Sequence, residues 1–426
     1  MAELKYRAPK GTNDLIFPES ERTEQVLALA GGILTLYGYR RINTPVFENT
    51  ELFKRSIGED TDIVTKEMYT FEEQGGESLT LRPEGTAPVI RAYLEKGLSS
   101  QGLPQKLFYR GPMFRRERPQ AGRFRQFQQI GAEAIGSADP LIDAEIISIS
   151  EALFRRLGLE RYRLVLNSVG CGQCRPAYRE ALTAFLEETA SSLCEQCQKR
   201  AVTNPMRVFD CKEDKCRQAL SGAPAISEYI CAECRQHFEG VMEGLEVLEV
   251  AFGVDSRLVR GLDYYTKTAF EFQFEGLGAQ NAVSAGGRYD YLAEELGGPP
   301  TPGVGFSMGV ERLMMSLDAE GLQPFAPTRL DVFVAGVEGV DRARELALLD
   351  SIRAEGIGVE MDFLGRSLKA QMKQADRLGA RLVLIIGGEE LERGQVALRD
   401  LGRSEQWNVP LSDAVSEVKQ FIEGAR

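Results

Sequence analysis

The sequence predicts a mixed α/β protein with more than one domain, and three observations carry that prediction. Two strand patterns, residues 107–117 and 124–135, flank the polar loop RPQAG and predict an antiparallel hairpin. Residues 329–426 alternate strand and helix patterns, which is typical of a separate α/β domain with a largely parallel sheet. All eight cysteines lie within residues 171–234, a segment that differs from its neighbours by its helical patterns and turn signals. A length of 426 residues also favours two to three domains.

The elements before the cysteine segment follow from local patterns. Residues 18–37 carry apolar side chains at helical spacing and acids in the first turn, which predicts a helix. The run RINTPVFE follows, and its Pro45 suits a strand near a sheet edge or interface. Residues 79–96 predict a strand, a Pro-Glu-Gly turn and a helix. Beyond the hairpin we expect a helix over 140–157 and a strand over 161–168.

The second half of the chain begins with a mainly helical, cysteine-rich insertion. Strand patterns resume over 258–276, and PFAPT at 324–328 has the composition of a linker. The predicted segments are a main domain in two parts, 1–170 and 251–323, the insertion, 171–250, and the C-terminal domain, 329–426.

Composition limits where the chain works and what it binds. There is no apolar run near the N-terminus and no long uncharged segment, so we expect a cytoplasmic protein without a membrane span. The formal net charge of −12 argues against general nucleic-acid affinity, which depends on bulk positive charge. Any polyanion must therefore meet a local basic patch.

The hairpin segment is such a patch, with six arginines and only two acids. Guanidinium groups grip phosphate or carboxylate with two parallel hydrogen bonds. Strand alternation predicts that Arg115 and Glu117 share a face of the first strand. The same rule places Gln129 and Glu133 on one face of the second strand, where Gly131 leaves a pocket. A solvated face with surface ion pairs is the alternative, but a site for a small zwitterion explains the pattern better.

A second anion signal lies in GVGFSMGVERLMM, residues 303–315. A glycine-rich turn before a helix lets backbone N–H groups approach a phosphate, and Arg312 would project from the start of that helix. Taken alone, a tight turn that packs Phe306 is the simpler interpretation.

The cysteines form the pairs Cys171-x2-Cys174, Cys194-x2-Cys197, Cys211-x4-Cys216 and Cys231-x2-Cys234, with His237, the only histidine, three residues further on. Such pairs in a cytosolic protein favour zinc over disulfides. Two interpretations stay open: reduced thiols without metal, or a zinc site formed by Cys194, Cys197, Cys231 and Cys234.

Together these segments resemble the class II aminoacyl-tRNA synthetases. FRRE with RFRQFQQ is similar to their motif 2, GVGFSMGVER to motif 3, and YGYRRINTPVFE to motif 1, whose proline lies at the dimer interface. RGLDYYT at 260–266 and AGGRYD at 285–290 resemble the signature peptides of bacterial-type histidyl-tRNA synthetases. The resemblance spans essentially the whole chain. It implies an α+β catalytic domain with the antiparallel class II sheet, a helical insertion and an anticodon-binding-type C-terminal domain.

The resemblance also implies roles for individual residues. The catalytic arginines would be Arg115, Arg260 and Arg312. ATP would be held by Arg115, Glu117, Arg123 and Arg312. Histidine would be bound by Glu84, Gly85, Thr86, Arg115, Gln129, Glu133, Arg260, Tyr264 and Tyr265, with close approach allowed by Gly286 and Gly287. Gln128 stands where many members have histidine, and alternation points it away from the Gln129 face.

The implied reaction joins L-histidine to ATP, with Mg2+, and then passes histidine to tRNA(His). Arg118 and Gln120 would contact the acceptor end of the tRNA. The residues Arg366, Lys369, Lys373 and Arg377 recur at helical spacing and would contact the anticodon stem, although a solvated helix face is the alternative. The family also implies a homodimer.

Three rival functions fit parts of the sequence. A histidine-binding regulatory subunit of ATP phosphoribosyltransferase resembles the catalytic domain, but it lacks the C-terminal domain and erodes the ATP and histidine motifs. A synthetase for threonine, proline or glycine would share that domain, but RGLDYY and Glu133 argue against it. A zinc-dependent binding module would leave the arginines unexplained.

Overall fold

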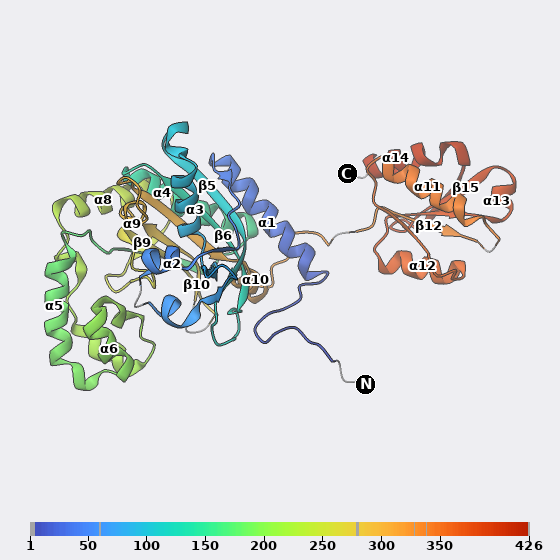
Figure 1. Cartoon of the computed structure of the whole chain (residues 1–426). Helices are drawn as coiled ribbons and strands as arrows, with labels where there is room; N and C mark the ends of the chain where they lie inside the picture. Colours follow the sequence, from blue (N-terminus) through green and yellow to red (C-terminus); the bar gives the residue numbers. More distant parts are fainter. Residues whose placement is uncertain (1–4, 59–60, 278–280, 328, 338, 425–426) are drawn as a thin grey trace. The chain divides into compact units, whose positions relative to one another are not determined.

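The computed structural model describes residues 5–58, 61–277, 281–327, 329–337 and 339–424. The chain forms two compact units, Met1–Phe325 and Ala326–Arg426 (Figure 1). Both combine helices with a β-sheet, so the predicted mixed α/β class is confirmed. Among the described residues, no helix has the length and apolarity needed to cross a membrane.

The first unit is organised around an eight-stranded sheet of order β1-β5-β6-β11-β10-β9-β7-β8. Neighbouring strands are antiparallel except for the parallel pairs β1–β5 and β7–β8. The strands are β1 (Arg40–Arg41), β5 (Gln105–Phe114), β6 (Gln126–Ile135), β7 (Tyr162–Ser168), β8 (Phe252–Val254), β9 (Thr266–Phe274), β10 (Ala282–Arg288) and β11 (Gly303–Gly309). The antiparallel sheet expected from the resemblance is thus present.

One face of this sheet carries the main hydrophobic core. Helices contribute to it from α1 (Glu19–Leu36), α4 (Pro140–Leu157), α8 (Ala232–Val247) and α10 (Val310–Ala319). Alternation in β6 sends Ile130, Ala132 and Ala134 into this core, so the residues between them face the opposite side. Helix α4 begins at an Asp139 cap and ends at Gly158, which has a φ of 78°, and its bounds match the prediction.

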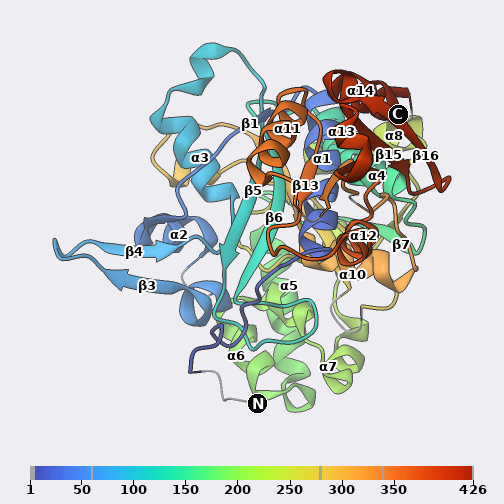
Figure 2. The ribbon, with the colours of Figure 1, turned by 90° about the vertical axis from the view of Figure 1, so that its right-hand side faces the viewer.

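The opposite face of the sheet is partly covered by a smaller core around α3 (Thr86–Glu95), and the polar site lies on this side. Helices α2 (Thr50–Ile57) and α9 (Leu292–Glu295) contact α3. A separate three-stranded sheet, β2 (Phe47–Asn49), β4 (Ser78–Leu81) and β3 (Tyr69–Glu72), projects from the unit (Figure 2).

Two sequence expectations about strands need correction. The glycine-rich segment expected to turn is the regular strand β11, paired with β6 and β10, and α10 follows it directly. Small residues there serve close packing between strands. In the hairpin, β5 ends at Phe114, so Arg115 and Glu117 do not share a strand face but lie in the loop beyond it.

The cysteine-rich segment is helical, as expected, with α5 (Arg175–Glu188), α6 (Glu195–Thr203) and α7 (Asp214–Ala219) to one side of the sheet (Figure 1). Helix α8 closes the segment and packs against α4, where Val241 and Leu245 join the main core. The insertion therefore starts and ends at the sheet.

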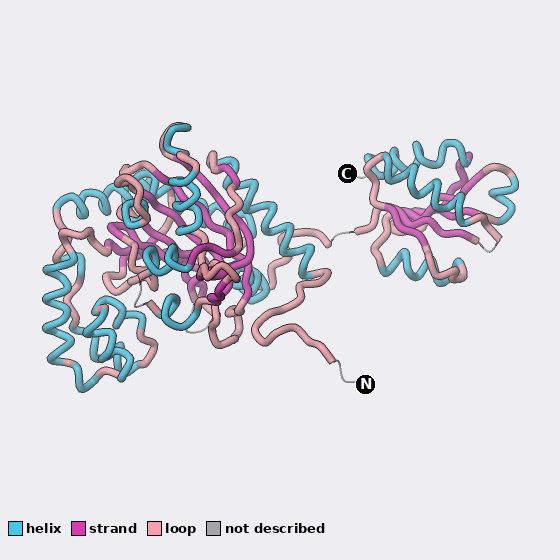
Figure 3. The backbone as a smooth tube through the Cα atoms, viewed as in Figure 1, coloured by secondary structure: helices cyan, strands magenta, loops and turns pink. Residues whose placement is uncertain are grey.

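The second unit has a five-stranded sheet of order β13-β12-β14-β15-β16 with helices on both faces (Figure 3). The strands are β12 (Val332–Gly336), β13 (Val359–Met361), β14 (Leu382–Ile386), β15 (Gln395–Asp400) and β16 (Glu405–Pro410). The helices are α11 (Arg342–Ala354), α12 (Leu368–Arg377), α13 (Gly388–Glu392) and α14 (Ala414–Gly424). Strand β12 runs parallel to β13 and β14, whereas β15 runs antiparallel to both β14 and β16. The sheet is therefore mixed.

Candidate active site

The loop between β5 and β6 contains five of the six arginines that the sequence singled out, and Arg110 lies on β5. The Nε atom of Arg115 donates to the carbonyl of Pro83 at 2.9 Å, and its guanidinium lies over the Phe127 ring, 5.4 Å from the centroid. Glu117 lies 4.0 Å from Arg115 and 2.5 Å from Arg123, measured between carboxylate oxygens and guanidinium nitrogens. Arg115 and Glu117 are therefore brought together by the loop, although not by strand alternation.

A cavity of about 740 Å³ opens beside this loop, a size that suits a small-molecule ligand. Its lining includes Arg115, Glu117, Arg123, Gln129, Arg260 and Arg312. The structure thus brings together every residue expected to bind ATP. Arg312, in the first turn of α10, donates to the carbonyls of Gly122 at 3.2 Å and Ala282 at 2.8 Å. These contacts hold its side chain across the sheet toward the hairpin loop.

The electrostatics of the cavity favour an anion. Burial lowers the pKa of Arg312, and the nearby charge of Arg123 lowers it further. Arg260 differs from Arg312, because its pKa is raised. Burial alone would lower that pKa, but the carboxylate of Glu271, 2.5 Å from Nη1, has the larger opposite effect. A bound phosphate would relieve the repulsion among the guanidinium groups.

Next to the cavity, Glu133 forms a fully buried carboxylate. The Thr86 hydroxyl donates to one oxygen at 2.7 Å, and the Tyr289 hydroxyl donates to the other at 2.6 Å. Burial raises the pKa of Glu133 to about 8, even though both hydroxyl groups favour the ionised form. Gln129 lies four residues earlier on the same strand face and lines the cavity.

Gln129 and Glu84 differ in how their acceptors are used. Among the described residues, the buried Oε1 atom of Gln129 has no hydrogen-bond partner. The carboxylate of Glu84 accepts from the backbone N–H groups of Thr86 at 2.6 Å and Ala87 at 2.9 Å. Glu84 therefore satisfies the start of α3, while Gln129 offers an unused acceptor to the cavity.

Tyr109 fills the space that Gly131 was expected to leave open. A Cβ atom on Gly131 would lie 2.3 Å from the Tyr109 hydroxyl, and one on Gly85 would lie 2.2 Å from the same ring. Both glycines are therefore needed for close packing of this tyrosine. The expectation of an open pocket at Gly131 is wrong because its strand partner in the hairpin register is Tyr109 itself.

The signature tyrosines pack together on the same side of the sheet. The ring centroids of Tyr264 and Tyr265 are 4.7 Å apart, and Tyr264 meets Tyr289 edge-on at 5.9 Å. A Cβ atom on Gly287 would lie 2.7 Å from the Tyr265 ring, so the glycine allows that contact. Tyr265 and Arg260 also line a second cavity of about 600 Å³.

Sequence reasoning missed Tyr109, Tyr289 and Glu271. Each had a signal: Tyr109 stands opposite Gly131 in the hairpin, and Tyr289 belongs to the peptide AGGRYD. Glu271 is the polar position between the core residues Phe270 and Phe272.

The residues proposed to meet a nucleic acid are mostly exposed. Arg118 and Gln120 lie on the outside of the hairpin loop, which is tightened by reciprocal backbone hydrogen bonds between Gln120 and Arg123. In the second unit, α12 exposes the side chains of Lys369, Lys373 and Arg377.

Arg366 does not belong to that basic helix face. Helix α12 begins at Leu368, and the Nε atom of Arg366 lies 2.5 Å from a carboxylate oxygen of Asp362. This ion pair fixes Arg366 beside the loop that precedes the helix, so the expected face of four residues reduces to three.

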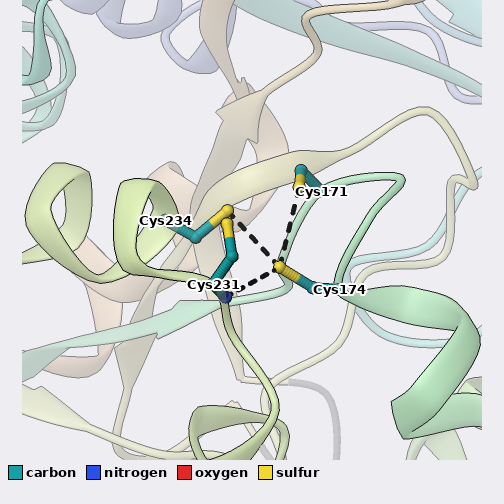
Figure 4. Close-up of side chains that lie close together, drawn as sticks. All are labelled: Cys171, Cys174, Cys231 and Cys234. Atoms are coloured by element: carbon teal, nitrogen blue, oxygen red, sulfur yellow. Dashed lines mark hydrogen bonds between the residues drawn. The ribbon is translucent and has the colours of Figure 1, made fainter.

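The expected set of four cysteines does not assemble. Cys231 and Cys234 lie with Cys171 and Cys174 (Figure 4), whereas Cys194 and Cys197 lie with Cys211 and Cys216. The cause is that α8, which begins just after Cys231, packs on the sheet where the insertion starts. His237 joins neither group, since its Nε2 atom lies 3.3 Å from Asp143.

Comparisons with known proteins agree with this geometry. A family model described as "Histidyl-tRNA synthetase" matches residues 11–313, and one described as "Anticodon binding domain" matches residues 331–421. The chain is 47% identical to the histidine–tRNA ligase of Halothermothrix orenii over 421 residues, which cover 98% of this chain and 100% of the relative. It is 50% identical to the histidine–tRNA ligase of Moorella thermoacetica over 417 residues, covering 97% and 98%.

Among solved structures, the apo histidyl-tRNA synthetase of S. aureus is similar with a TM-score of 0.82 and 37% identity, covering 97% of this chain and 100% of that one. The match of a family model to most of the chain, and relatives at these identities over nearly its whole length, show that the chain belongs to the histidyl-tRNA synthetase family.

Proposed function

We propose that the chain is a histidine–tRNA ligase, which activates L-histidine with ATP and transfers it to the 3′ end of tRNA(His). The observation that carries the proposal is the arginine-lined cavity beside the buried carboxylate of Glu133. Relatives that are named histidine–tRNA ligases support the same function. They favour it over a histidine-sensing regulatory subunit, as does the match to an anticodon-binding domain.

In the first step, ATP occupies the arginine-lined cavity. Arg115 grips the α-phosphate and the histidine carboxylate, and Arg260 adds a second guanidinium near the α-phosphate. Arg312 holds the γ-phosphate, while Glu117 and Arg123 hold ATP from the hairpin loop. Support comes from the shared lining of one cavity and from the charge repulsion that an anion would relieve.

The chemistry of this step needs no protein nucleophile. A histidine carboxylate oxygen attacks the α-phosphorus, the bond to the β-phosphate breaks, and pyrophosphate leaves. Positioned guanidinium groups stabilise the charge that develops on the phosphoryl group. Glu117 and Glu271 line the cavity and would supply carboxylate oxygens to Mg2+, whose charge would help to neutralise the leaving pyrophosphate.

The residues proposed to surround histidine are Glu84, Gly85, Thr86, Arg115, Gln129, Glu133, Arg260, Tyr264 and Tyr265. The Oε1 atom of Gln129, which has no hydrogen-bond partner in the described part of the chain, suits the α-amino group. Glu133 and Tyr265 would meet the imidazole. An amino acid without an imidazole N–H would lack the donor that pairs with ionised Glu133, beyond the hydroxyl groups of Thr86 and Tyr289, which favours histidine.

In the second step, the terminal ribose hydroxyl of tRNA(His) attacks the activated carbonyl carbon, and AMP leaves. Arg118 and Gln120 are proposed to meet the acceptor end, and α12 the anticodon stem. The exposure of these side chains supports both contacts. A tRNA substrate also supports a cytoplasmic location.

We also propose that the chain is a homodimer joined through the motif 1 region. Val46 and Phe47, next to Pro45, are 40% and 46% exposed, and Phe71, on β3 of the same three-stranded sheet as Phe47, is 44% exposed. Exposed apolar side chains gathered in one region favour burial against another protein surface.

The test of the ligase function is ATP–pyrophosphate exchange with each of the twenty amino acids in turn. We expect histidine to be the one amino acid that supports ATP–pyrophosphate exchange. Histidine binding without exchange would favour the regulatory subunit, and exchange with another amino acid would reassign the specificity.

A further inference from the structure

The cysteine sulfurs of the insertion form two separate groups of four. Within each group, all four Sγ atoms lie within 4.8 Å of one another. In the first group, Cys174 Sγ lies 3.6 Å from Cys171 Sγ and 3.7 Å from Cys234 Sγ (Figure 4). In the second, Cys194 Sγ lies 3.9 Å from Cys211 Sγ.

These distances match metal ligands and not disulfides. Four sulfurs around zinc, with Zn–S bonds of about 2.3 Å, are about 3.8 Å apart in a tetrahedron. A disulfide would need about 2.05 Å between sulfurs. All eight cysteines are free, and six of them are buried.

Backbone N–H groups point at the sulfurs in both groups. The Cys231 amide lies 3.1 Å from Cys174 Sγ in the first group. In the second, the Cys194 amide lies 3.2 Å from Cys216 Sγ, and the Cys197 amide lies 3.4 Å from Cys194 Sγ. Donors of this kind stabilise thiolates and orient them as ligands.

We propose that the chain binds two zinc ions in the insertion, one at each group of four cysteines. The first site is Cys171, Cys174, Cys231 and Cys234. The second is Cys194, Cys197, Cys211 and Cys216. Four cysteine sulfurs this close together, three of them buried in each group, would give zinc a complete set of four ligands with no open position, which makes both sites structural.

The first site joins the two ends of the insertion at the sheet. Cys171 and Cys174 precede α5, and Cys231 and Cys234 stand at the start of α8. Arg175, directly after Cys174, donates to the backbone carbonyls of Val169 and Tyr265. A zinc ion here holds the insertion beside the tyrosine that the proposed function assigns to histidine.

The second site builds one wall of the arginine-lined cavity. Cys211 and its neighbour Lys212 both line that cavity, and Arg217 donates to the Cys211 carbonyl at 3.4 Å. On α6, between the two halves of the site, Arg200 pairs with Asp62 of the main body at 2.9 Å. A zinc ion at the second site therefore fixes a wall of the pocket that, on the proposed function, holds ATP.

Metal analysis of the full chain tests the two sites without relying on any activity. The protein purified under reducing conditions is expected to contain two zinc ions per chain. The double variants C171S/C174S and C211S/C216S should each contain one. A single site at Cys194, Cys197, Cys231 and Cys234 would leave both variants with the metal content of the parent chain, and that result would overturn the proposal.

Cobalt substitution keeps the test decisive if a variant fails to fold. After zinc removal, the parent chain should take up two equivalents of Co2+ with the visible absorption of tetrahedral cobalt–thiolate sites. Uptake of one equivalent or none would contradict the proposal.

The role of the second site in the wall of the arginine-lined cavity is tested separately, by ATP binding to the C211S/C216S variant. Calorimetry should show binding weakened by about tenfold, with histidine binding unchanged. The C171S/C174S variant is the matched control, and equal ATP affinity in both variants and the parent chain would overturn the role of the second site.

Discussion

Glu133 is expected to make histidine affinity depend on pH. The carboxyl is fully buried, and burial raises its pKa to about 8. At pH 7 it is mainly neutral, and only the ionised form offers a negatively charged acceptor to an imidazole N–H. Histidine affinity should therefore rise as the pH approaches and passes 8, in proportion to the ionised fraction.

The magnitude follows from that pKa. With a pKa of about 8, roughly a tenth of Glu133 is ionised at pH 7 and roughly three quarters at pH 8.5, so the Kd for histidine should fall by about eightfold. Glu133 also affects stability, because its pKa rises on folding from 4.5 to about 8. The stability it contributes is present below pH 4.5 and lost as the pH rises through about 8, by an amount on the order of 5 kcal/mol.

The substitution Glu133→Gln removes both effects while keeping the shape of the side chain. Histidine binding would be measured by calorimetry from pH 7 to 8.5 in both proteins. The amino group of histidine titrates identically in each, so the ratio of the two Kd values isolates Glu133. If the variant binds histidine too weakly for calorimetry, the thermal midpoint of unfolding would be measured from pH 5 to 9 instead. As the pH rises over this range, the parent chain should lose stability relative to the variant. Parallel curves for the two proteins would refute the reasoning.

Three further outcomes follow from the site and the fold. Replacing Arg312 with Gln should lower ATP–pyrophosphate exchange by about 10²-fold with histidine binding unchanged; an unaltered rate would contradict its role. Asp143→Ala leaves the fully buried Arg288 with Asp290 as its remaining carboxylate partner, so thermal or urea unfolding should show a loss of about 3 kcal/mol, and Asp143→Asn a smaller one. Reversing Lys369 and Lys373 to Glu should raise the KM for tRNA and flatten its salt dependence but spare exchange; an unchanged KM would remove α12 from the interface.

Much of the fold and part of the site could be predicted from the local periodicity of the sequence. The hairpin, α4 and the polar face of β6 follow from spacing alone, because side chains alternate across a strand and recur along a helix face. The alternation that buries Ile130 and Ala132 also places Gln129 and Glu133 on the opposite face. Arg115 and Arg123 were identified because they belong to a group of six arginines that, in an acidic chain, needs an anion to explain it, whereas Arg312 came from the segment 303–315 and Arg260 from the family resemblance.

Features that depend on tertiary contacts could not be predicted in this way. Which cysteines meet depends on how α8 returns to the sheet, and spacing within a CxxC pair does not encode that path. The ring of Tyr109 occupies the space over Gly131 because β5 and β6 pair in a particular register. Small residues in β11 resemble a turn, but neighbouring strands on both sides hold them extended.

Charging of tRNA with labelled histidine tests directly whether the chain is a histidine–tRNA ligase. The purified chain would be mixed with ATP, Mg2+, histidine and a tRNA(His) transcript, and acid-precipitable label would be followed over time. We expect histidine to become attached to the 3′ end of the tRNA through an ester that mild base releases, and omission of ATP to abolish the signal. Histidine binding with no label on the tRNA, under conditions where the chain is folded, would contradict it.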